Sequence, residues 1–509
     1  MSVSPSADSQ MHETVRAVID DWAASAPDAL FLINPANGEK TSYRVLQQRV
    51  QSVSAHIANW GYKPGDPVAY ALSNSPEAAI VILGILYGGY LATAINLVAG
   101  NNTISYVLEH SETKLLIANE AGLAALETPL QERSGVSVQI VSPDLFQQLN
   151  SSSEEEADAL TGGLLMYTSG TTGRPKGVVL SQASLLAGGR NTTLAHELTG
   201  EDCGLCVLPL YHINGLCVTV MGTLVSGGSL VIPAKFSVST FWQKVITQGC
   251  TWFSVVPTQI SYLLHDSAYV PEQSDLKDVR FGRSASAPLS PDVQSAFESK
   301  FGIPIIETMG LTETSAQILS NPLPPGVRKI GSPGVAYGNE VRIGDELQRD
   351  LPRGTEGEVL VRGPNVMSHY LKNEQATQDA VTAEGWLRTG DLGRMDEEGY
   401  VYITGRLKEL IIKGGENIAP REVDEALYTH PDVVEAAAFA RKCDRYGETV
   451  EAAVMVSEGS ALTEVALIEI CTAKLGKFKT PERVHFLPEL PKGPSGKIQR
   501  IKLVEQFRR

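Results

Sequence analysis

The chain has 509 residues, with 43% apolar and 20% charged side chains and a formal net charge of -16. This length exceeds one compact core, so we expect two or more globular domains. The negative charge leaves no broad basic surface for a nucleic acid, and no apolar run approaches the ~18 residues of a membrane span.

The first hundred residues alternate helical patterns with short apolar strands. The helical patterns cover 15–24 and 43–61, and the strands cover 67–72 and 90–95. Such alternation indicates α/β layers around a largely parallel sheet. The polar, acidic stretch at 150–163 predicts a solvated loop, and a buried strand is expected to follow from Leu164 to Thr168.

The α/β pattern continues until short strands between Gly and Pro, from about Gly331 to Val361, predict a β-rich subdomain. In the last hundred residues, a helix at Pro420 to Thr429, two strands and a helix over Ala461 to Lys474 indicate a small α+β unit. We therefore expect an α/β fold with a large N-terminal domain of several subdomains over 1–405 and a small C-terminal domain over 409–509.

The six cysteines are scattered and form neither a disulfide framework nor a structural zinc pattern. Cys203 and Cys206 form a C-x-x-C without a second pair, so we expect buried packing, with redox or metal chemistry as the alternative. The start lacks the apolar core of a signal peptide, and the end lacks a peroxisomal signal. These features indicate a protein of the reducing cytoplasm.

Residues 167–177 read YTSGTTGRPKG and combine glycines, hydroxyl side chains and cations directly after an apolar strand. Glycines let the backbone approach phosphate, while hydroxyls, N–H groups and Lys176 can bind its oxygens. The spacing does not match a Walker loop. The pattern predicts a phosphate-binding loop, and a mobile surface loop is the alternative.

This loop resembles the signature of the adenylate-forming superfamily, which contains acyl-CoA synthetases, peptide-synthetase adenylation domains and firefly-type luciferases. Seven further blocks match that superfamily in the expected order, and the wording is most similar to the oxalate-CoA ligase group. The blocks are LPLYHINGL at 208–216, SASAPL at 284–289, ETMGLTE at 307–313, RGPNVMSHY at 362–370, GWLRTGD at 385–391, GRLKELIIKGGENIAPREVD at 405–424 and PKGPSGKI at 491–498.

The resemblance implies an ATP- and Mg²⁺-dependent acid–thiol ligase that works in two steps. The acid would first form an acyl-adenylate with release of pyrophosphate. A thiol, most simply that of coenzyme A, would then take the acyl group and release AMP. The expected partners are thus a small carboxylic acid, ATP and coenzyme A, while the oligomeric state is not predicted.

The same resemblance assigns the phosphate chemistry to particular residues. Thr312 would contact the α-phosphate, Glu313 would bind Mg²⁺, and Lys497 would stabilise the charge that develops as the carboxylate attacks. The residues expected to hold the β- and γ-phosphates are Thr168, Ser169, Gly170, Thr171, Thr172, Gly173 and Lys176.

The nucleoside is expected between two segments and a turn. Asp391 would accept from the ribose hydroxyls, with Arg406 and Ile403 beside it. Adenine would lie between Ser284, Ala285 and Ser286 on one side and Glu307, Thr308, Met309 and Gly310 on the other. Met309 replaces the usual aromatic residue, and we expect its thioether to pack on the purine face.

The second half-reaction would use a rotated small domain. The resemblance places a hinge at 406–408, centred on Lys408, and makes the C-terminal domain mobile. The residues expected near the thiol are Gly414, Gly415, Glu416 and Tyr446. For Tyr446, simple packing is the alternative.

The acyl pocket is expected to be lined by His212, Asn214, Gly215, Met221, Ser284 and Ala285. His212 is a candidate catalytic residue or pocket gate. No aspartate stands where amino-acid-activating relatives pair an ammonium group, which argues against an α-amino acid. Ala316 stands where oxalate enzymes place a histidine, so we expect a small or medium aliphatic or aromatic monocarboxylate.

Three alternatives to a CoA ligase follow from the same motifs. A free-standing adenylating enzyme would load a carrier-protein thiol, and residues 478–483 (FKTPER) are not richly basic for the 3′-phosphate of coenzyme A. A luciferase-type oxidase would share the first step. A non-catalytic nucleotide-binding relative would not be expected to retain Lys176, Glu313, Asp391 and Lys497 together.

Overall fold

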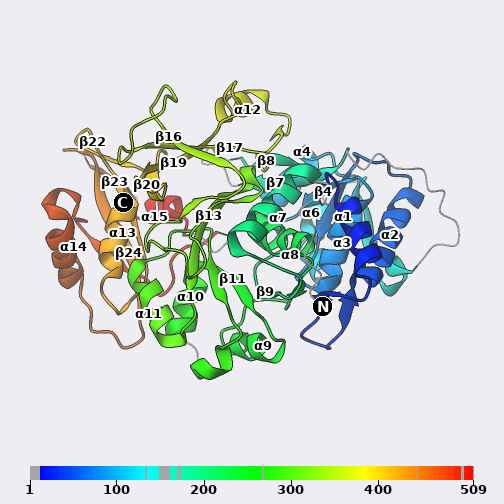
Figure 1. Cartoon of the computed structure of the whole chain (residues 1–509). Helices are drawn as coiled ribbons and strands as arrows, with labels where there is room; N and C mark the ends of the chain where they lie inside the picture. Colours follow the sequence, from blue (N-terminus) through cyan, green and yellow to red (C-terminus); the bar gives the residue numbers. More distant parts are fainter. Residues whose placement is uncertain are drawn as a thin grey trace.

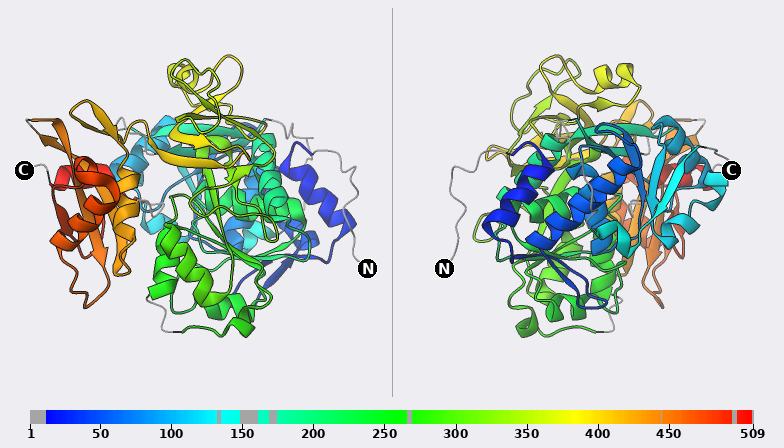
Figure 2. Two further views of the ribbon diagram at one scale, coloured as in Figure 1. Left: turned by 60° about the vertical axis from the view of Figure 1, so that its left-hand side comes forward. Right: turned by 90° about the vertical axis from the view of Figure 1, so that its right-hand side faces the viewer.

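The computed structural model (Figure 1) describes most of the chain and shows a large unit and a smaller C-terminal unit at one side of it. The described residues are 12–131, 135–147, 161–168, 174–265, 269–443, 445–493 and 498–507. The C-terminal unit, orange to red in Figure 2, projects beside the large unit in the left-hand view. The observed architecture confirms the predicted α/β class.

The first sheet has seven strands in the order β18-β8-β7-β4-β3-β5-β6, and the pairs from β7 to β6 are parallel. Its strands are β3 (Pro67–Ala71), β4 (Leu91–Ala94), β5 (Leu115–Ala118), β6 (Ser137–Ile140), β7 (Gly163–Thr168), β8 (Lys176–Ser181) and β18 (His369–Tyr370). Strands β7 and β8 form an antiparallel pair that carries the predicted phosphate loop between them.

The second sheet has nine strands in the order β15-β14-β13-β12-β11-β9-β10-β1-β2, parallel from β13 to β1. Its strands are β1 (Leu30–Ile33), β2 (Lys40–Ser42), β9 (Cys203–Cys206), β10 (Ser229–Val231), β11 (Trp252–Val255), β12 (Phe281–Ser284), β13 (Ile305–Leu311), β14 (Ala316–Ser320) and β15 (Val335–Ala336). Cys203 and Cys206 are buried in β9, which confirms the packing interpretation.

The helices of the large unit pack around these two sheets, and the largest apolar core lies among α1, α2, α3, α7 and both sheets. The helices are α1 (Val15–Ser25), α2 (Tyr43–Asn59), α3 (Pro76–Tyr87), α4 (Asn101–His110), α5 (Glu120–Ala124), α6 (Glu127–Gln131), α7 (Gln182–His196), α8 (Gly222–Ser226), α9 (Phe241–Thr247), α10 (Pro257–His265), α11 (Pro291–Phe301) and α12 (Glu374–Ala380). Short turns are η1 (Pro143–Phe146), η3 (Gln273–Leu276) and η4 (Thr312–Thr314), and η2 (Asn214–Met221) is a π-helix.

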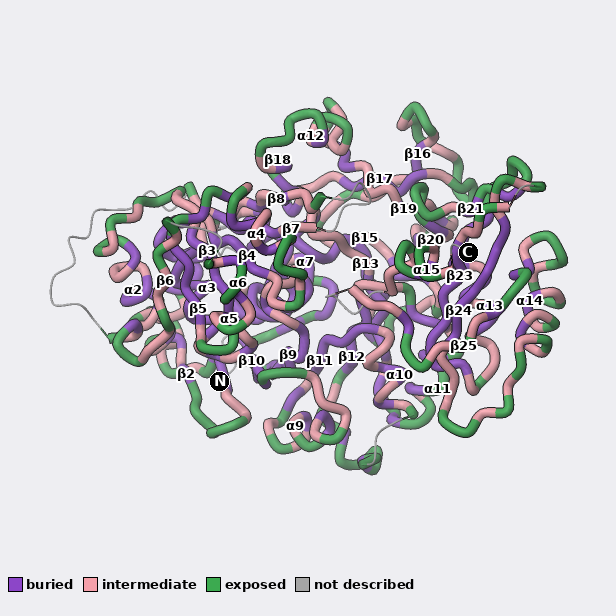
Figure 3. Tube along the Cα trace, turned by 180° about the vertical axis from the view of Figure 1, so that it is seen from behind, coloured by how far each residue is buried: buried purple, intermediate pink, exposed green. Residues whose placement is uncertain are grey.

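Local sequence explains how the phosphate-loop hairpin continues into a helix. Ser181 ends β8 and caps α7, because its hydroxyl accepts the backbone N–H of Ser184 at 3.1 Å. The next fifteen residues, Gln182 to His196, then form α7 against η2. The site-bearing hairpin is therefore fixed to the buried core, which is purple in Figure 3.

A third sheet of four antiparallel strands forms the β-rich subdomain, in the order β16-β17-β19-β20. Its strands are β16 (Glu340–Gly344), β17 (Gly357–Arg362), β19 (Leu387–Met395) and β20 (Val401–Arg406). The subdomain was predicted for Gly331 to Val361 and in fact continues to Arg406. Strands β19 and β20 were missed because the intervening α12 segment interrupts the pattern.

The C-terminal unit is α+β, as predicted. Its five-stranded sheet has the order β22-β21-β24-β23, with β25 beside β24. Its elements are β21 (Ile411–Lys413), β22 (Glu416–Ile418), α13 (Pro420–Tyr428), β23 (Val433–Cys443), β24 (Gly447–Val456), α14 (Glu464–Lys479), β25 (Val484–Phe486) and α15 (Arg500–Gln506). Helix α14 starts later than expected because Thr463 caps it.

The change of sheet occurs between the end of β20 at Arg406 and the start of β21 at Ile411. The predicted hinge residue Lys408 lies in this exposed connection. Its hinge role, and the division at 405 and 409, stay predictions. Within the described ranges, the helices are all too short or too polar to cross a membrane.

Candidate functional site

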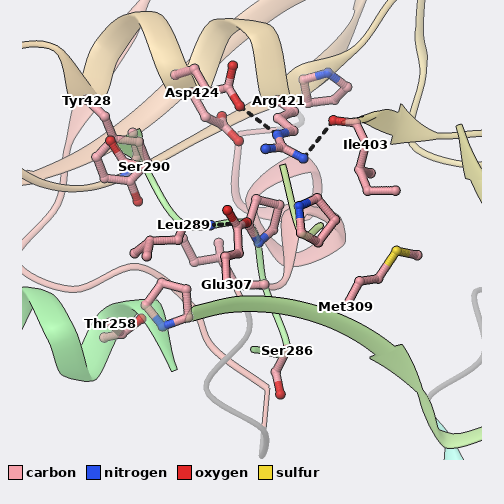
Figure 4. Close-up of a pocket in the computed structure, with 18 of the residues that line it drawn as sticks. Thr258, Ser286, Leu289, Ser290, Glu307, Met309, Ile403, Arg421, Asp424 and Tyr428 are labelled. Atoms are coloured by element: carbon pink, nitrogen blue, oxygen red, sulfur yellow. Dashed lines mark hydrogen bonds and ion pairs between the residues drawn. The ribbon is translucent and has the colours of Figure 1, made fainter. Parts of the chain in front are cut away.

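A cavity of about 250 Å³ lies where the second sheet, the β-rich subdomain and the C-terminal unit meet. Its lining includes eight of the residues predicted to bind ATP. These are Ser286, Glu307, Thr308, Met309, Gly310, Asp391, Ile403 and Arg406. Residues from separate parts of the chain are thus brought to one site, and Figure 4 shows several of them around it.

The two predicted adenine segments lie side by side because β12 and β13 are parallel neighbours. Ser284 pairs with Glu307, and the Thr308 hydroxyl donates to the Ser284 carbonyl at 3.2 Å. Ser286 and Met309 continue these strands along the cavity (Figure 4). The pairing of the two strands therefore places both segments at the cavity. That adenine binds between them stays a prediction.

Glu307 is a buried carboxylate that faces this cavity. Its side chain is labelled near the centre of Figure 4, and its Oε1 accepts the Leu289 backbone N–H at 3.2 Å. Among the described residues, none hydrogen-bonds its Oε2. Burial raises the pKa of Glu307, and the charge of Arg421 acts in the opposite direction. The second oxygen can accept a donor group from a ligand.

Asp391 and Arg406 stand opposite each other on β19 and β20. The Arg406 Nε donates to Asp391 Oδ1 at 2.6 Å, and the Asp391 side chain is only 5% exposed. Asp391 raises the pKa of Arg406, whereas burial opposes its charge. This cross-strand pair fixes a carboxylate at the cavity edge, as an acceptor of paired ribose hydroxyls would require.

Of the predicted phosphate and Mg²⁺ residues that the structure describes, Lys176 and Glu313 both contact Tyr370. Thr168 and Lys176 are opposite each other in the β7–β8 hairpin. Lys176 Nζ lies 4.6 Å from the Tyr370 ring centroid, and the Tyr370 hydroxyl donates to Glu313 Oε1 at 2.9 Å. Thr312 begins the same short turn as Glu313. The hairpin end and the Glu313 carboxylate are therefore neighbours.

The remaining phosphate-loop residues, Ser169, Gly170, Thr171, Thr172 and Gly173, lie outside the described residues, as does Lys497. The residues after Lys497 are described: Ile498 and Arg500 line the cavity. Ile498 also forms an isolated β-bridge with Lys492. The roles predicted for the undescribed residues stay predictions.

Glu313 suits Mg²⁺ that is bound together with a nucleotide. Within the described ranges, no group of three or more His, Cys, Asp or Glu side chains is arranged to hold a metal by itself. Mg²⁺ commonly keeps water molecules and takes one or two carboxylates plus substrate phosphates. A single carboxylate held beside the phosphate hairpin fits that pattern.

The predicted acyl-pocket residues form a second group, deeper in the large unit. Asn214 starts the buried π-helix η2, and its Nδ2 donates to Ser286 Oγ at 3.1 Å. The others, His212, Gly215, Met221, Ser284 and Ala285, are buried or half-buried, and none of the six is part of the cavity lining. Ser286 connects the two groups of residues.

The residues predicted for the thiol lie apart from the cavity. Gly414, Gly415 and Glu416 form the exposed turn between β21 and β22. The Gly414 backbone N–H donates to the Tyr446 carbonyl at 2.8 Å. The four residues are therefore grouped, but the cavity is lined without them. Their role in thiol transfer stays a prediction.

Several cavity residues were missed in the sequence. Arg421, Asp424 and Arg500 all line it, and Arg421 Nη1 donates to the Ile403 carbonyl at 2.6 Å (Figure 4). Arg421 and Asp424 belong to the block at 405–424 and Tyr370 to the block at 362–370, so the blocks indicated these segments. Arg500 follows the last block, and sequence spacing alone does not show which side chains face a cavity.

Comparison with known proteins agrees with this geometry. Residues 19–371 match the AMP-binding enzyme family, and residues 422–497 match the AMP-binding enzyme C-terminal domain. A sulfoacetate–CoA ligase of Cupriavidus necator is 44% identical over 503 residues, covering 97% of this chain and 98% of the relative. An oxalate–CoA ligase of Arabidopsis thaliana is 35% identical over 513 residues, covering 97% and 99%.

A solved structure shows that the similarity extends to the three-dimensional fold. The crystal structure of ATP-bound MatB from Rhodopseudomonas palustris superposes with a TM-score of 0.88 and 30% identity, covering 97% of this chain and 99% of that one. The family models, the full-length relatives and this structure agree with the predicted resemblance. The chain belongs to the AMP-binding enzyme family, the adenylate-forming enzymes.

Proposed function

We propose that this protein is an ATP- and Mg²⁺-dependent carboxylic acid:CoA ligase. The observation that carries the proposal is the cavity where Glu307, Asp391 and Arg406 meet Ile498 and Arg500, which follow Lys497 in the chain. The full-length match to proteins named as CoA ligases supports coenzyme A as the thiol. Their acids differ, so the relatives' names do not identify the acid used here.

The first step joins the acid to AMP. A carboxylate oxygen attacks the α-phosphorus of ATP, the bond to the β-phosphate oxygen breaks, and pyrophosphate leaves with the bonding electrons. Lys176 and Lys497 offset the negative charge of the reactants, and Thr312 donates to the α-phosphate. Asp391 and Arg406 orient the ribose, while Glu307 and Met309 bound the adenine. Glu313 would hold Mg²⁺, which would supply positive charge to the phosphates when bound.

The second step transfers the acyl group. The thiol sulfur attacks the acyl carbon, the thiol proton is lost, and AMP leaves with the electrons of the anhydride bond. The exposed glycines at 414–415 offer a backbone that a thiol-bearing arm can approach closely. We propose that rotation about Lys408 brings this turn to the acyl-adenylate, because the turn does not line the cavity in the present arrangement.

Loading of a carrier-protein thiol remains the second candidate function, because the first step would be identical. The exposed turn at 414–416 is accessible to a protein-bound arm as well as to coenzyme A. A location in the cytoplasm stays a prediction from composition.

Pyrophosphate release from ATP over a panel of acids, each with and without coenzyme A, tests the proposal. We expect release that requires one class of acid and becomes faster with coenzyme A, with acyl-CoA identified by mass. Acid-dependent adenylate without an acyl-CoA product would favour carrier loading. The absence of release with every acid would contradict the ligase.

A further inference from the structure

Arg283 is a fully buried arginine next to the candidate acyl pocket. It lies on β12 and is 1% exposed. Its Nη1 donates to Asn214 Oδ1 at 2.7 Å and to Ser254 Oγ at 3.3 Å, and its Nε donates to Gln317 Oε1 at 3.3 Å. All three acceptors are neutral, so these hydrogen bonds satisfy donors without balancing the charge.

The charge of Arg283 has no anionic partner in the described part of the chain, where no carboxylate forms an ion pair with it. The nearby titratable groups are His196 on α7 and Cys217 on η2. Burial lowers the pKa of His196 and raises that of Cys217, so both are neutral at pH 7. Burial also lowers the pKa of Arg283 to about 9, which still leaves it protonated at neutral pH. A buried uncompensated charge is strongly unfavourable, and a bound anion would relieve it.

A chain of hydrogen bonds connects this cation to the cavity. Arg283 donates to the Asn214 amide oxygen, and the Asn214 amide nitrogen donates to Ser286 Oγ at 3.1 Å. Ser286 lines the cavity, and in Figure 4 it lies on the opposite side of Glu307 from Arg421. Because its oxygen accepts from Asn214, its own proton remains available for a ligand. We call these three residues the Arg283 relay.

Two further features of this region suit a polar ligand. Ser286 has a backbone φ of 75°, a left-handed conformation that a residue with a side chain adopts at an energetic cost and that is common at ligand sites. Ser284 is fully buried, and its hydroxyl has no hydrogen-bond partner among the described residues. Buried hydroxyls normally have a partner, so this one points to a missing acceptor.

We propose that the Arg283 relay makes the enzyme specific for acids that carry a second anionic group, a carboxylate or sulfonate, besides the carboxylate that reacts. This inference rests on the proposed ligase function. The second anion lies at the Ser284–Ser286 end, where the relay supplies donors and Arg283 supplies the balancing charge. A second anionic group differs from the monocarboxylate expected from the sequence blocks, because Arg283 lies just outside the block at 284–289.

The positive charge of Arg283 favours a bound anion, whereas its hydrogen bonds alone would not require one. A glutamine at position 283 could donate to Asn214 and Ser254 without placing a cation in the interior. Hydrogen bonds in a chain polarise one another, so a cation at its inner end strengthens the donor at its outer end. An uncharged terminal methyl would leave both the donor and the cation without a partner.

Matched acids that differ only at the distal end test the wild-type enzyme. The pairs are malonate with propionate, succinate with butyrate, and sulfoacetate with propionate. We expect kcat/KM for pyrophosphate release to favour the dianionic member of at least one pair by ~100-fold or more, as expected when a buried donor loses its acceptor. Preference for malonate or for sulfoacetate then distinguishes a carboxylate from a sulfonate.

Two variants assign that preference to Arg283. Arg283→Gln should lower kcat/KM for the preferred dianionic acid by ~100-fold, mainly through KM, and leave the monoanionic partner within ~3-fold. Arg283→Lys should retain part of the preference, because it keeps the charge. Arg190→Gln is the control, since Arg190 is a half-buried arginine that donates to the His12 carbonyl and does not contact the Arg283 relay.

A second substitution covers the case in which Arg283→Gln does not fold. Asn214→Asp would place a carboxylate against the guanidinium and balance the charge inside the protein, which favours folding. We expect it to abolish the preference for dianionic acids. Preference for monoanionic acids in the wild type, or unchanged selectivity in both variants, would overturn the inference while leaving the ligase intact. Absence of turnover with every acid would instead contradict the ligase itself.

Discussion

Tyr370 contacts two charged groups on the phosphate side of the site. Its ring lies beneath Lys176, and its hydroxyl donates to Glu313. Burial and the neighbouring Glu313 both raise the pKa of Tyr370, so it acts as a neutral donor throughout the physiological range. One buried phenol thereby fixes the separation between the hairpin lysine and the carboxylate expected to bind Mg²⁺.

Replacing Tyr370 by Phe should lower kcat/KM for ATP by about 10-fold. The ring contact with Lys176 remains, but the Glu313 carboxylate loses a hydrogen bond worth ~1.5–3 kcal/mol. Pyrophosphate release measured across ATP and Mg²⁺ concentrations checks this. Tyr402→Phe is the control, because that hydroxyl contacts Asp396 at 3.5 Å. Equal kinetics in both variants would remove Tyr370 from the site.

Glu307→Gln should change how stability depends on pH. Burial raises the pKa of Glu307, so the folded protein binds this proton more tightly than the unfolded chain does. The contribution of Glu307 to stability is therefore fully present below the ordinary carboxyl pKa of 4.5 and is lost as pH rises through the higher, folded value. The variant lacks this loss and should have the higher melting temperature at neutral pH.

Thermal unfolding of wild type and variant from pH ~4 to ~8 measures this difference. Glu298→Gln is expected to change the melting temperature at neutral pH in the opposite direction. Although burial opposes the charge of Glu298, hydrogen bonds from Arg328 and Gln294 lower its pKa. Its contribution is present above the unfolded pKa, so Glu298→Gln should melt earlier at neutral pH. If the melting temperatures of the two variants shifted in the same direction at neutral pH, the opposite pKa shifts of Glu307 and Glu298 would be contradicted.

At the scale of elements, the β13–β14 pair holds the site together through a close backbone contact. A Cβ on Gly310 would lie 1.8 Å from the Ala316 carbonyl oxygen, and the pairing is irregular between Met309 and Gly310. The irregularity lets β13 carry both Met309 and the turn that begins at Thr312. The sequence block ETMGLTE indicated this segment, but not the strand that approaches it.

Gly310→Ala should destabilise the protein by about 1–3 kcal/mol, because the backbone of β14 must move away. It should also raise KM for ATP, since Gly310 lines the cavity. Thermal unfolding and pyrophosphate release measure the two effects. Gly100→Ala is the control, because an added Cβ there meets nothing within 4 Å. A Gly310 variant as stable as this control would contradict the contact.

Across the molecule, a hydrogen bond from a buried ion pair of the C-terminal unit reaches the large unit beside the cavity. Lys492 Nζ lies 2.8 Å from Glu435 Oε1 and donates to the Tyr262 hydroxyl on α10 at 3.0 Å. The Glu435 side chain is 2% exposed. Glu435 and Tyr262 raise the pKa of Lys492 although burial opposes its charge.

Lys492→Met should lower stability by about 3–5 kcal/mol, because it leaves Glu435 buried without a cation. The double variant Lys492→Met with Glu435→Gln should recover most of this loss. Thermal unfolding of both variants checks the prediction. Lys372→Met, which breaks an exposed pair with Glu112, should melt like wild type. No recovery in the double variant would show that the pair is not the cause.

Local sequence patterns were enough to predict the family, the α/β class and the segments that form the site. Strand and helix periodicity, Ser and Thr caps and the phosphate-loop string are local patterns, so residues close in sequence suffice to specify them. Even there, β19 and β20 were missed where α12 interrupts the pattern, and α14 was placed too early.

Which side chains of those segments meet depends on how the sheets and helices pack in the folded chain. The contact between Tyr370 and Glu313 depends on the pairing of β18 with β8. The hydrogen bonds that connect Arg283 to Ser286 through Asn214 depend on the packing of η2 against β12. The burial that shifts the pKa of Glu307 and leaves Arg283 without an anion is also a property of distant neighbours. Such contacts arise from sheet order and packing, which short-range sequence patterns do not encode.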